Sequence, residues 1–116
     1  WMACGAHDFK AGAAWYGRLV RPAQNAEADR LYPNEIADQL RCPVLGLYAE
    51  NDQGIPLDSV ETMRQALAAA GRTDSEIIVY PGTDHGFHAD YRPMYDAAAA
   101  ADGWSRMLRL FGERLA

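Results

Sequence analysis

Three short runs of almost continuous apolar residues are the first regular feature of the chain. They cover residues 9–16, 44–49 and 77–80, and glycine or proline borders each run. Strands that are covered on both faces, as in parallel sheets, have this pattern, whereas half-exposed strands alternate apolar and polar residues. The pattern therefore predicts three buried strands of a parallel sheet.

The region between the second and third runs has the period of a helix. Apolar residues recur there at the three-and-four spacing of one helical face. They are Leu57, Val60, Met63, Leu67 and Ala70. Asp58 with Glu61 has the form of a capping box, and Gly71 has the position of a helix stop. Strand, helix and strand then form a βαβ unit, so we expect parallel neighbouring strands with a right-handed crossover.

A longer amphipathic pattern over residues 93–115 predicts the last helix of the chain. Its expected buried stripe is Ala97, Ala101, Trp104, Leu108, Phe111 and Leu115. We interpret the aromatic residues of this stripe as core rather than as a binding surface. Residues 18–41 are polar and irregular, and we expect a long connection there with one short helix at residues 34–40.

Composition and charge narrow the class of protein. The 116 residues include 49% hydrophobic and 23% charged positions, the balance of a globular domain. The formal net charge is −5 with no basic run, so we expect no nucleic-acid partner, because phosphate binding needs clustered Lys and Arg. No apolar stretch approaches the roughly 20 residues that span a bilayer, so we expect no membrane partner. The patterns together predict the α/β fold class.

The cysteines indicate the cellular compartment of the protein, and the first residue bears on whether the chain is complete. Cys4 and Cys42 are too few for a disulfide framework or a metal site. We expect two reduced thiols in a cytoplasmic protein without metal or cofactor, and the alternative is one long-range disulfide. Because the chain begins at Trp1 and is patterned almost from its start, we expect a piece of a longer polypeptide, and a signal peptide upstream is left open.

An acid and a histidine follow two of the predicted strands. Asp52 lies in the turn after the second strand, and His85 lies in the loop after the third. The carboxyl ends of parallel neighbours meet at one edge of the sheet, where open α/β sheets bind ligands. A carboxylate beside an imidazole fixes its tautomer, so that the histidine can take a proton from a nucleophile. Acid before histidine is also the chain order of α/β-hydrolase triads.

Each of these residues also has an ordinary structural interpretation. Asp52 can close an Asx turn, and His85 can be a surface loop residue. For either residue alone the structural interpretation is favoured, whereas their pairing at two strand ends favours structure and catalysis about equally. His7 and His88 show no partner in the sequence, and we expect both at the surface.

The sequence contains no Gly-x-Ser-x-Gly or Gly-x-Cys-x-Gly segment, the usual setting of a hydrolase nucleophile. Ser59 and Ser105 fall within predicted helices. Ser75 and Cys42 precede strands, at the edge opposite the acid and the histidine. Cys4 has no strand before it, so we expect a structural thiol there.

Four segments resemble the dienelactone hydrolase family, in order along nearly the whole chain. Residues 42–56, with CPVLGLY followed by ND and IP, resemble that family's acid segment. Residues 80–87, YPGTDHGF, resemble its catalytic-histidine segment. Residues 13–19 resemble the strand after its nucleophile helix, and residues 91–108 resemble its terminal helix.

The resemblance implies an α/β-hydrolase fold with a Cys-Asp-His triad, in which Asp52 is the acid and His85 the base. That family's nucleophilic cysteine lies in a Gly-x-Cys-x-Gly elbow, which the match puts upstream of Trp1. The chain then represents one partial domain, 1–116, with three strands and two main helices of the parallel sheet and without the elbow. Tyr16 and Arg92 are the residues expected to contact substrate. Because Arg92 lies further from the histidine than the family's carboxylate-binding arginine, helix capping or pairing with nearby acids is its alternative role.

Two classes of function follow. We expect the whole protein to hydrolyse a small-molecule ester or lactone, with this chain supplying acid and base and inactive when isolated. The alternative is a catalytically silent, truncated α/β domain that forms a homodimer or binds a partner such as the missing N-terminal half, because an incomplete sheet has a bare edge. A third hypothesis, a flavodoxin-like ligand binder, has less support, because Gly82 and Gly86 flank a histidine and form no phosphate-binding loop.

Overall fold

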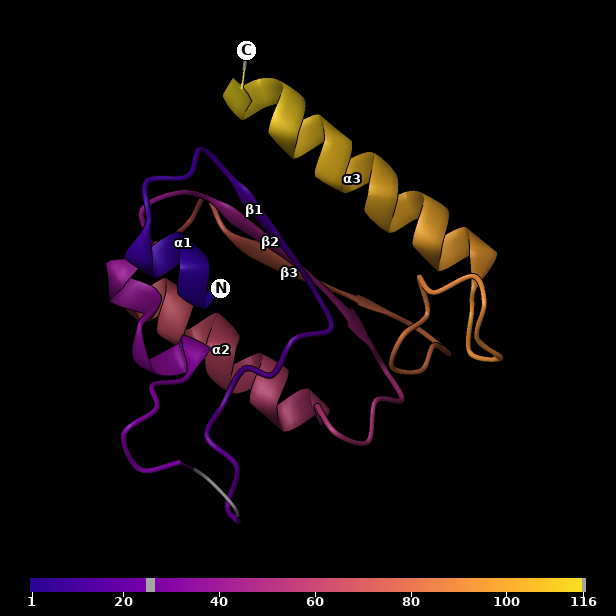
Figure 1. Ribbon diagram of the computed structural model, residues 1–116, viewed down its shortest axis with the longest axis horizontal. Helices are drawn as coiled ribbons and strands as arrows, with labels where there is room; N and C mark the ends of the chain where they lie inside the picture. The colour runs from indigo at the N-terminus through magenta and orange to yellow at the C-terminus, as the bar shows by residue number, and fades with distance from the viewer. Residues whose placement is uncertain (25–26, 116) are drawn as a thin grey trace.

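The computed structural model describes residues 1–24 and 27–115 (Figure 1). Its helices are α1 (Met2–Ala6), η1 (Pro33–Glu35), η2 (Ala37–Gln39), α2 (Leu57–Ala69) and α3 (Ala97–Leu115), of which η1 and η2 are 3-10 helices. Its strands are β1 (Gly12–Trp15), β2 (Val44–Ala49) and β3 (Glu76–Tyr80). Within these residues no helix is both long and apolar enough to cross a membrane.

The described strands form one parallel sheet in the order β1-β2-β3. In Figure 1, α1 and α2 lie on one side of this sheet and α3 lies on the other. Every residue of β2 is buried, because helices cover both of its faces. Two apolar clusters follow the same division, one around Met63 of α2 and one around Met107 of α3. The three layers confirm the predicted α/β fold class.

The first strand is shorter than its apolar run. The sequence predicts a strand over residues 9–16, whereas β1 covers Gly12–Trp15 and Phe9 is 48% exposed. The register explains the difference: Gly12 lies opposite Val44, the first residue of β2, so the residues before Gly12 have no residue of β2 opposite them. β2 has the predicted bounds, and β3 begins one residue earlier than predicted, at Glu76.

Helix α2 connects β2 and β3, which are parallel neighbours as predicted, but its predicted capping box is wrong. The N-cap residue is Pro56, and the Ser59 hydroxyl donates to the Pro56 carbonyl over 2.6 Å. Asp58 therefore lies already inside the first turn, where its charge favours the helix dipole, and it does not pair with Glu61 as a cap. At the other end Gly71 has φ +70°, the left-handed conformation of a helix stop, as predicted.

The predicted short helix over residues 34–40 is replaced by η1 and η2. Ile36 separates them, because its φ of −119° and ψ of 14° lie outside the helical range. Both turns pack against α2, with Ile36 and Leu40 buried there. Burial of these two side chains, rather than a continuous helix, therefore fixes the segment.

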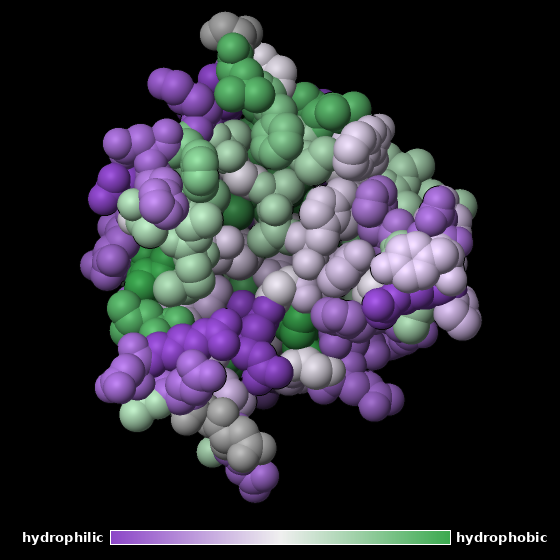
Figure 2. All heavy atoms as spheres, in the orientation of Figure 1, coloured by the Kyte–Doolittle hydropathy of each residue, from purple (hydrophilic) through white to green (hydrophobic). Residues whose placement is uncertain are grey.

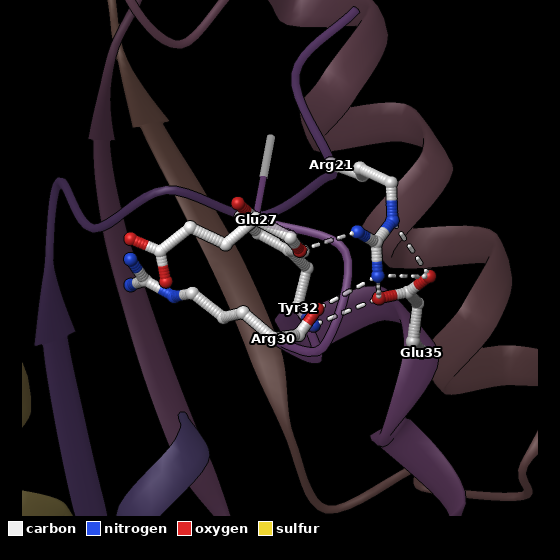
Figure 3. Close-up of polar contacts among 5 residues, drawn as sticks. All are labelled: Arg21, Glu27, Arg30, Tyr32 and Glu35. Carbon is white, nitrogen blue, oxygen red and sulfur yellow. Dashed lines mark hydrogen bonds and ion pairs between the residues drawn. The ribbon is translucent and has the colours of Figure 1, made fainter. Parts of the chain in front are cut away.

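Arg21 organises the connection between β1 and β2 (Figure 3). Its guanidinium pairs with the Glu35 carboxylate over 3.0 Å and donates to the carbonyls of Arg30 (2.7 Å) and Glu27 (3.0 Å). The Glu35 carboxylate also accepts the Tyr32 N–H over 2.9 Å. The hydrogen bond from Arg21, followed by that from Tyr32, lowers the pKa of Glu35.

Helix α3 buries a different face from the predicted one. It begins at Ala97 rather than at residue 93, because the Asp96 carboxylate accepts the Ala99 N–H over 3.0 Å and caps the first turn. Its buried residues are Ala99, Ala100, Gly103 and Met107. Of the predicted stripe, Phe111 is half-buried, and the exposed residues are Ala97, Ala101, Trp104, Leu108 and Leu115.

A close approach between α3 and the sheet accounts for this change of face. A Cβ added at Gly103 would lie 2.8 Å from the ring of Trp15, so the helix backbone lies directly against the indole. Small residues permit that distance, so Trp104 and Leu108 lie on the exposed side of α3, while Met107 is the buried large side chain that packs against the sheet. Figure 2 shows apolar side chains gathered over the face where β1 and α3 lie.

Candidate active site

The acid and the histidine meet at the carboxyl edge of the sheet. Asp52 follows β2 and His85 follows β3, and Nδ1 of the imidazole lies 2.6 Å from Oδ2 of the carboxylate. An ionised carboxylate has only acceptor atoms, so Nδ1 carries the hydrogen and donates it. Nε2 of the neutral imidazole is then the atom that can accept a proton.

Backbone contacts hold the two loops together. The Asn51 N–H donates to the Thr83 carbonyl over 2.9 Å, and the Gly82 N–H donates to the Glu50 carboxylate over 3.0 Å. Inside the second loop, the Thr83 hydroxyl donates to the Tyr80 carbonyl over 2.7 Å. These bonds join the ends of β2 and β3 and so fix the distance between the acid and the histidine.

Asp52 uses its two carboxylate oxygens differently. Oδ1 accepts the N–H groups of Gly54 (2.9 Å) and Ile55 (3.1 Å), while Oδ2 faces His85. Its relative exposure is 5%. The Asx turn and the contact with the histidine therefore occur together, and the turn fixes the rotamer that directs Oδ2 at the imidazole.

A glycine after His85 lets the chain reverse. Gly86 has φ +87°, a conformation that other residues rarely adopt. On one side of this reversal the side chain of His85 is 51% exposed, and on the other Phe87 is fully buried. Phe87 anchors the loop in the core, and the imidazole is presented at the surface.

A cavity of about 630 Å³ opens beside the two residues. Its lining residues are Tyr16, Arg18, Asn51, Asp52, Gln53, Gly54, Ile55, Asp84, His85 and Met94. Arg18 is a cation that the sequence reasoning missed. The signal was present, because Arg18 follows β1 just as Asp52 follows β2, and all parallel strands end at the same edge.

Tyr16 lies in this cavity wall, and Arg92 lies beyond it. The centroid of the Tyr16 ring is 4.9 Å from that of His85. Burial raises the pKa of Tyr16, the nearby Tyr91 raises it further, and Arg92 lowers it. Arg92 is exposed, stacks over the Tyr91 ring at 5.5 Å and does not line the cavity.

The other histidines differ in their environment. His7 is exposed, as expected, and lies beside Phe9. His88 is not a free surface residue: its ring is half-buried between the indoles of Trp15 (4.1 Å) and Trp104 (5.8 Å). The sequence contained no signal for this stack, because its members come from β1, the last loop and α3.

The thiols lie at the opposite edge of the sheet. Cys4 packs against Gly12, which begins β1, so that a Cβ at Gly12 would collide with the Cys4 sulfur. Cys42 just precedes β2; both cysteines are buried free thiols. Burial, and next the neighbouring Cys4, raises the pKa of Cys42 to about 11. Cys42 therefore has neither the position nor the ionisation of a nucleophile, and Cys4 does not have the position.

The serines lie outside the two loops that carry the acid and the histidine. Ser59 donates to the Pro56 carbonyl, Ser75 accepts the Val44 N–H at the amino ends of the strands, and Ser105 is exposed on α3. Across residues 1–24 and 27–115, no serine or cysteine forms a hydrogen bond with His85. The same residues contain no group of three or more His, Cys, Asp or Glu arranged to hold a metal ion.

The chain is similar to known proteins along almost all of its length. The model of the "Dienelactone hydrolase family" matches residues 1–115. The "Putative carboxymethylenebutenolidase" of Salmonella typhi is 52% identical over 106 residues, which cover 91% of this chain and 38% of that protein. The protein of the same name from Escherichia coli K12 is 53% identical over 104 residues, covering 90% of this chain and 37% of that protein.

A solved structure shows the same fold. The crystal structure of a "Putative Dienelactone Hydrolase" from Klebsiella pneumoniae superposes with a TM-score of 0.85 at 47% sequence identity. The match covers 97% of this chain and 46% of that one. The chain thus spans less than half the length of the relatives it matches.

Proposed function

The chain belongs to the dienelactone hydrolase family, and we propose that the whole protein hydrolyses a small-molecule ester or lactone with Asp52 as acid and His85 as base. The observation that carries this proposal is the contact of 2.6 Å between Asp52 Oδ2 and His85 Nδ1 at the mouth of a cavity. Burial of the carboxylate and exposure of the imidazole support these roles, since the base must reach a substrate and its orienting acid need not.

The first half of the reaction forms an acyl-enzyme. Nε2 of His85 takes the proton from a cysteine or serine that lies outside this chain, and the resulting thiolate or alkoxide attacks the ester carbonyl carbon. Asp52 stabilises the imidazolium that forms. When the tetrahedral intermediate collapses, the carbon–oxygen bond of the leaving alcohol breaks, and the imidazolium gives that oxygen its proton.

The second half returns the enzyme to its starting state. His85 takes a proton from water, and the hydroxide attacks the acyl carbon. The bond to the nucleophile breaks, the nucleophile regains the proton from the imidazolium, and a carboxylic acid leaves. Backbone N–H donors for the oxyanion are supplied by the same outside part, next to the nucleophile.

Two arginines and one tyrosine are the candidate substrate contacts. Tyr16 and Arg18 line the cavity, and Arg92 lies near Tyr16. A substrate with a carboxylate needs a local cation, because the net charge of −5 gives no long-range attraction. We assign Tyr16 and Arg18 to the wall that contacts substrate, and Arg92, outside that wall, to a substrate carboxylate that extends beyond the cavity.

The test replaces Asp52 by Asn and His85 by Ala in the full-length protein and measures turnover of p-nitrophenyl acetate. We expect kcat to fall by about 10³- to 10⁴-fold in each variant, because the base is lost or its tautomer is no longer fixed. Asp90→Asn and His7→Ala are matched controls on exposed residues and keep the wild-type rate. Wild-type turnover in both site variants would contradict the assignment.

A second candidate function rests on the exposed apolar surface. β1 has a strand on one side only within the described sheet, and Trp104 (47%) and Leu108 (51%) of α3 are exposed. Such a surface suits a silent module that pairs with itself or with a partner subunit. Light scattering measures whether the chain forms a dimer, and an esterase assay measures whether the full-length protein hydrolyses esters. A dimeric chain and an inactive full-length protein together favour the silent module.

A further inference from the structure

Tyr16 connects the candidate base to the core of the molecule. Its ring packs edge-on against His85 at an interplanar angle of 62°, with 4.9 Å between centroids. The same ring lies 5.4 Å from Phe87, again edge-on, and Phe87 is fully buried. Tyr16 therefore lies between the exposed side chain of His85 and the buried side chain of Phe87.

The backbone of Tyr16 is strained. Its φ of +40° is the sole positive value among the non-glycine residues that the structure describes. A bulky residue rarely adopts this conformation, and such strain persists only where the surrounding structure imposes it. Here the Tyr16 N–H still donates to the Leu47 carbonyl over 2.7 Å, so the residue remains bonded to β2 while its conformation departs from that of a strand.

The strain has a geometric effect on the side chain. Alternation along β1 puts Ala13 and Trp15 against the α3 face and Ala14 against the α2 face, so a regular strand would direct residue 16 to the α2 face as well. Tyr16 packs against the α2 cluster but also contacts Phe87, which belongs to the cluster on the α3 face. The left-handed turn therefore brings the phenol ring over the edge of the sheet, against the imidazole.

The orientation of the His85 imidazole depends on few contacts. Its side chain is 51% exposed, and within the described residues its one hydrogen bond is that from Nδ1 to Asp52. Nδ1 lies off the Cβ–Cγ axis, so turning the ring about that bond breaks this one hydrogen bond and lets Nε2 leave the cavity. A ring packed edge-on against the imidazole adds a steric barrier to that rotation.

We propose that Tyr16 is a positioning residue for His85: its strained backbone holds the phenol ring against the imidazole so that Nε2 faces the cavity. The role rests on the proposed function of His85 and is distinct from a contact of the Tyr16 hydroxyl with substrate. It needs the ring and does not need the hydroxyl.

The experiment compares Tyr16→Gly, Tyr16→Leu and Tyr16→Phe in the full-length protein. Tyr95→Leu is the control, because Tyr95 is an exposed ring that lines a second hollow with Tyr16 and is not among the described ring contacts of His85. We expect Tyr16→Gly and Tyr16→Leu to lower kcat about 10- to 100-fold, the cost of a misplaced base, with a smaller change in KM. Tyr16→Phe rescues most of that loss. The order parameter of the His85 Cε1–H bond by NMR is expected to fall in the Gly and Leu variants and to stay near the wild-type value in the Phe variant.

Two results would overturn the proposal. One is a Tyr16→Gly or Tyr16→Leu protein whose kcat and His85 order parameter match the wild type. The other is a Tyr16→Phe protein that loses as much kcat as Tyr16→Gly, because the hydroxyl would then be the active part. If the Gly variant does not fold, Tyr16→Asn replaces it, since Asn tolerates a positive φ. The order parameter tests the Tyr16–His85 contact even where the Asp52 and His85 variants show that the proposed function is wrong.

Discussion

At the scale of single residues, Asp52 shows how one side chain can satisfy two demands. Its Oδ1 closes the turn after β2, and its Oδ2 receives the His85 N–H. The sequence leaves the turn and the paired acid as two alternative interpretations of this aspartate. In this chain they are compatible, because a carboxylate has two oxygens and each can accept separately.

This division predicts different stabilities for two substitutions of Asp52. Asp52→Ala leaves the N–H groups of Gly54 and Ile55 without an acceptor near a buried site, so we expect a loss of about 2–3 kcal/mol in the free energy of unfolding. Asp52→Asn keeps the amide oxygen for these donors, so we expect a loss of at most about 1 kcal/mol. Urea denaturation of the chain measures both, and equal losses would show that the turn does not depend on Oδ1.

At the scale of elements, α3 shows where amphipathic patterns fail. The sequence contains two apolar rows, one of large residues such as Trp104 and Leu108 and one of small residues such as Ala100 and Gly103. Reading the large row as buried is the usual choice, because large side chains gain more from burial. The structure buries the small row instead, together with Met107, because at Gly103 α3 approaches Trp15 too closely for a larger side chain.

Two glycines of α3 give a matched test of that approach. Gly103→Ala would bring a Cβ to 2.8 Å from the Trp15 ring, which is itself stacked on His88, so we expect a loss of about 1–2 kcal/mol in unfolding free energy despite the better helix propensity. Gly112→Ala meets no atom within 4 Å and should gain up to about 1 kcal/mol. Thermal or urea denaturation checks the opposite signs, and a stabilised Gly103→Ala protein would contradict the close packing.

At the scale of the whole molecule, two carboxylates in separate parts of the fold make its stability depend on pH. Glu35 pairs with Arg21 in the connection, and Asp102 of α3 accepts hydrogen bonds from Tyr80 (2.6 Å) and Arg106 (2.7 Å). The hydrogen bond from Tyr80 is the largest cause of the lowered pKa of Asp102, followed by that from Arg106. The pKa of Glu35 is also lowered, first by Arg21.

The direction of these pKa changes predicts acid sensitivity. A carboxyl whose pKa is lower in the folded than in the unfolded chain stabilises the fold above its ordinary value, 4.5 for Glu35 and 3.8 for Asp102. That stabilisation disappears as the pH falls through the lower values of the folded chain. We therefore expect the urea midpoint to fall as the pH is lowered past these ordinary values, and to fall less in a Glu35→Gln, Asp102→Asn double variant. An identical fall in both proteins would exclude these two groups as the cause.

The incomplete coverage of the relatives also belongs to this scale. The chain spans 38% of the Salmonella typhi relative, and its serines and cysteines lie away from His85. We expect the chain alone to hydrolyse p-nitrophenyl acetate no faster than free imidazole at the same concentration, because without a cysteine or serine to activate, His85 offers only the direct attack of an imidazole on an activated ester. Turnover that depends on His85 and exceeds that of free imidazole by about 100-fold or more would contradict this expectation.

The sequence by itself determined the sheet, the crossover helix and the pair of residues at its carboxyl edge. Buried parallel strands, helical period and the common edge of parallel strands are local or topological rules, so β2, α2, Asp52 and His85 could be found without coordinates. Only the tertiary structure decided which face of α3 is buried, where β1 begins, and that His88 and Tyr16 pack as they do. Those features depend on distances between elements far apart in the chain, and no periodic pattern records such distances.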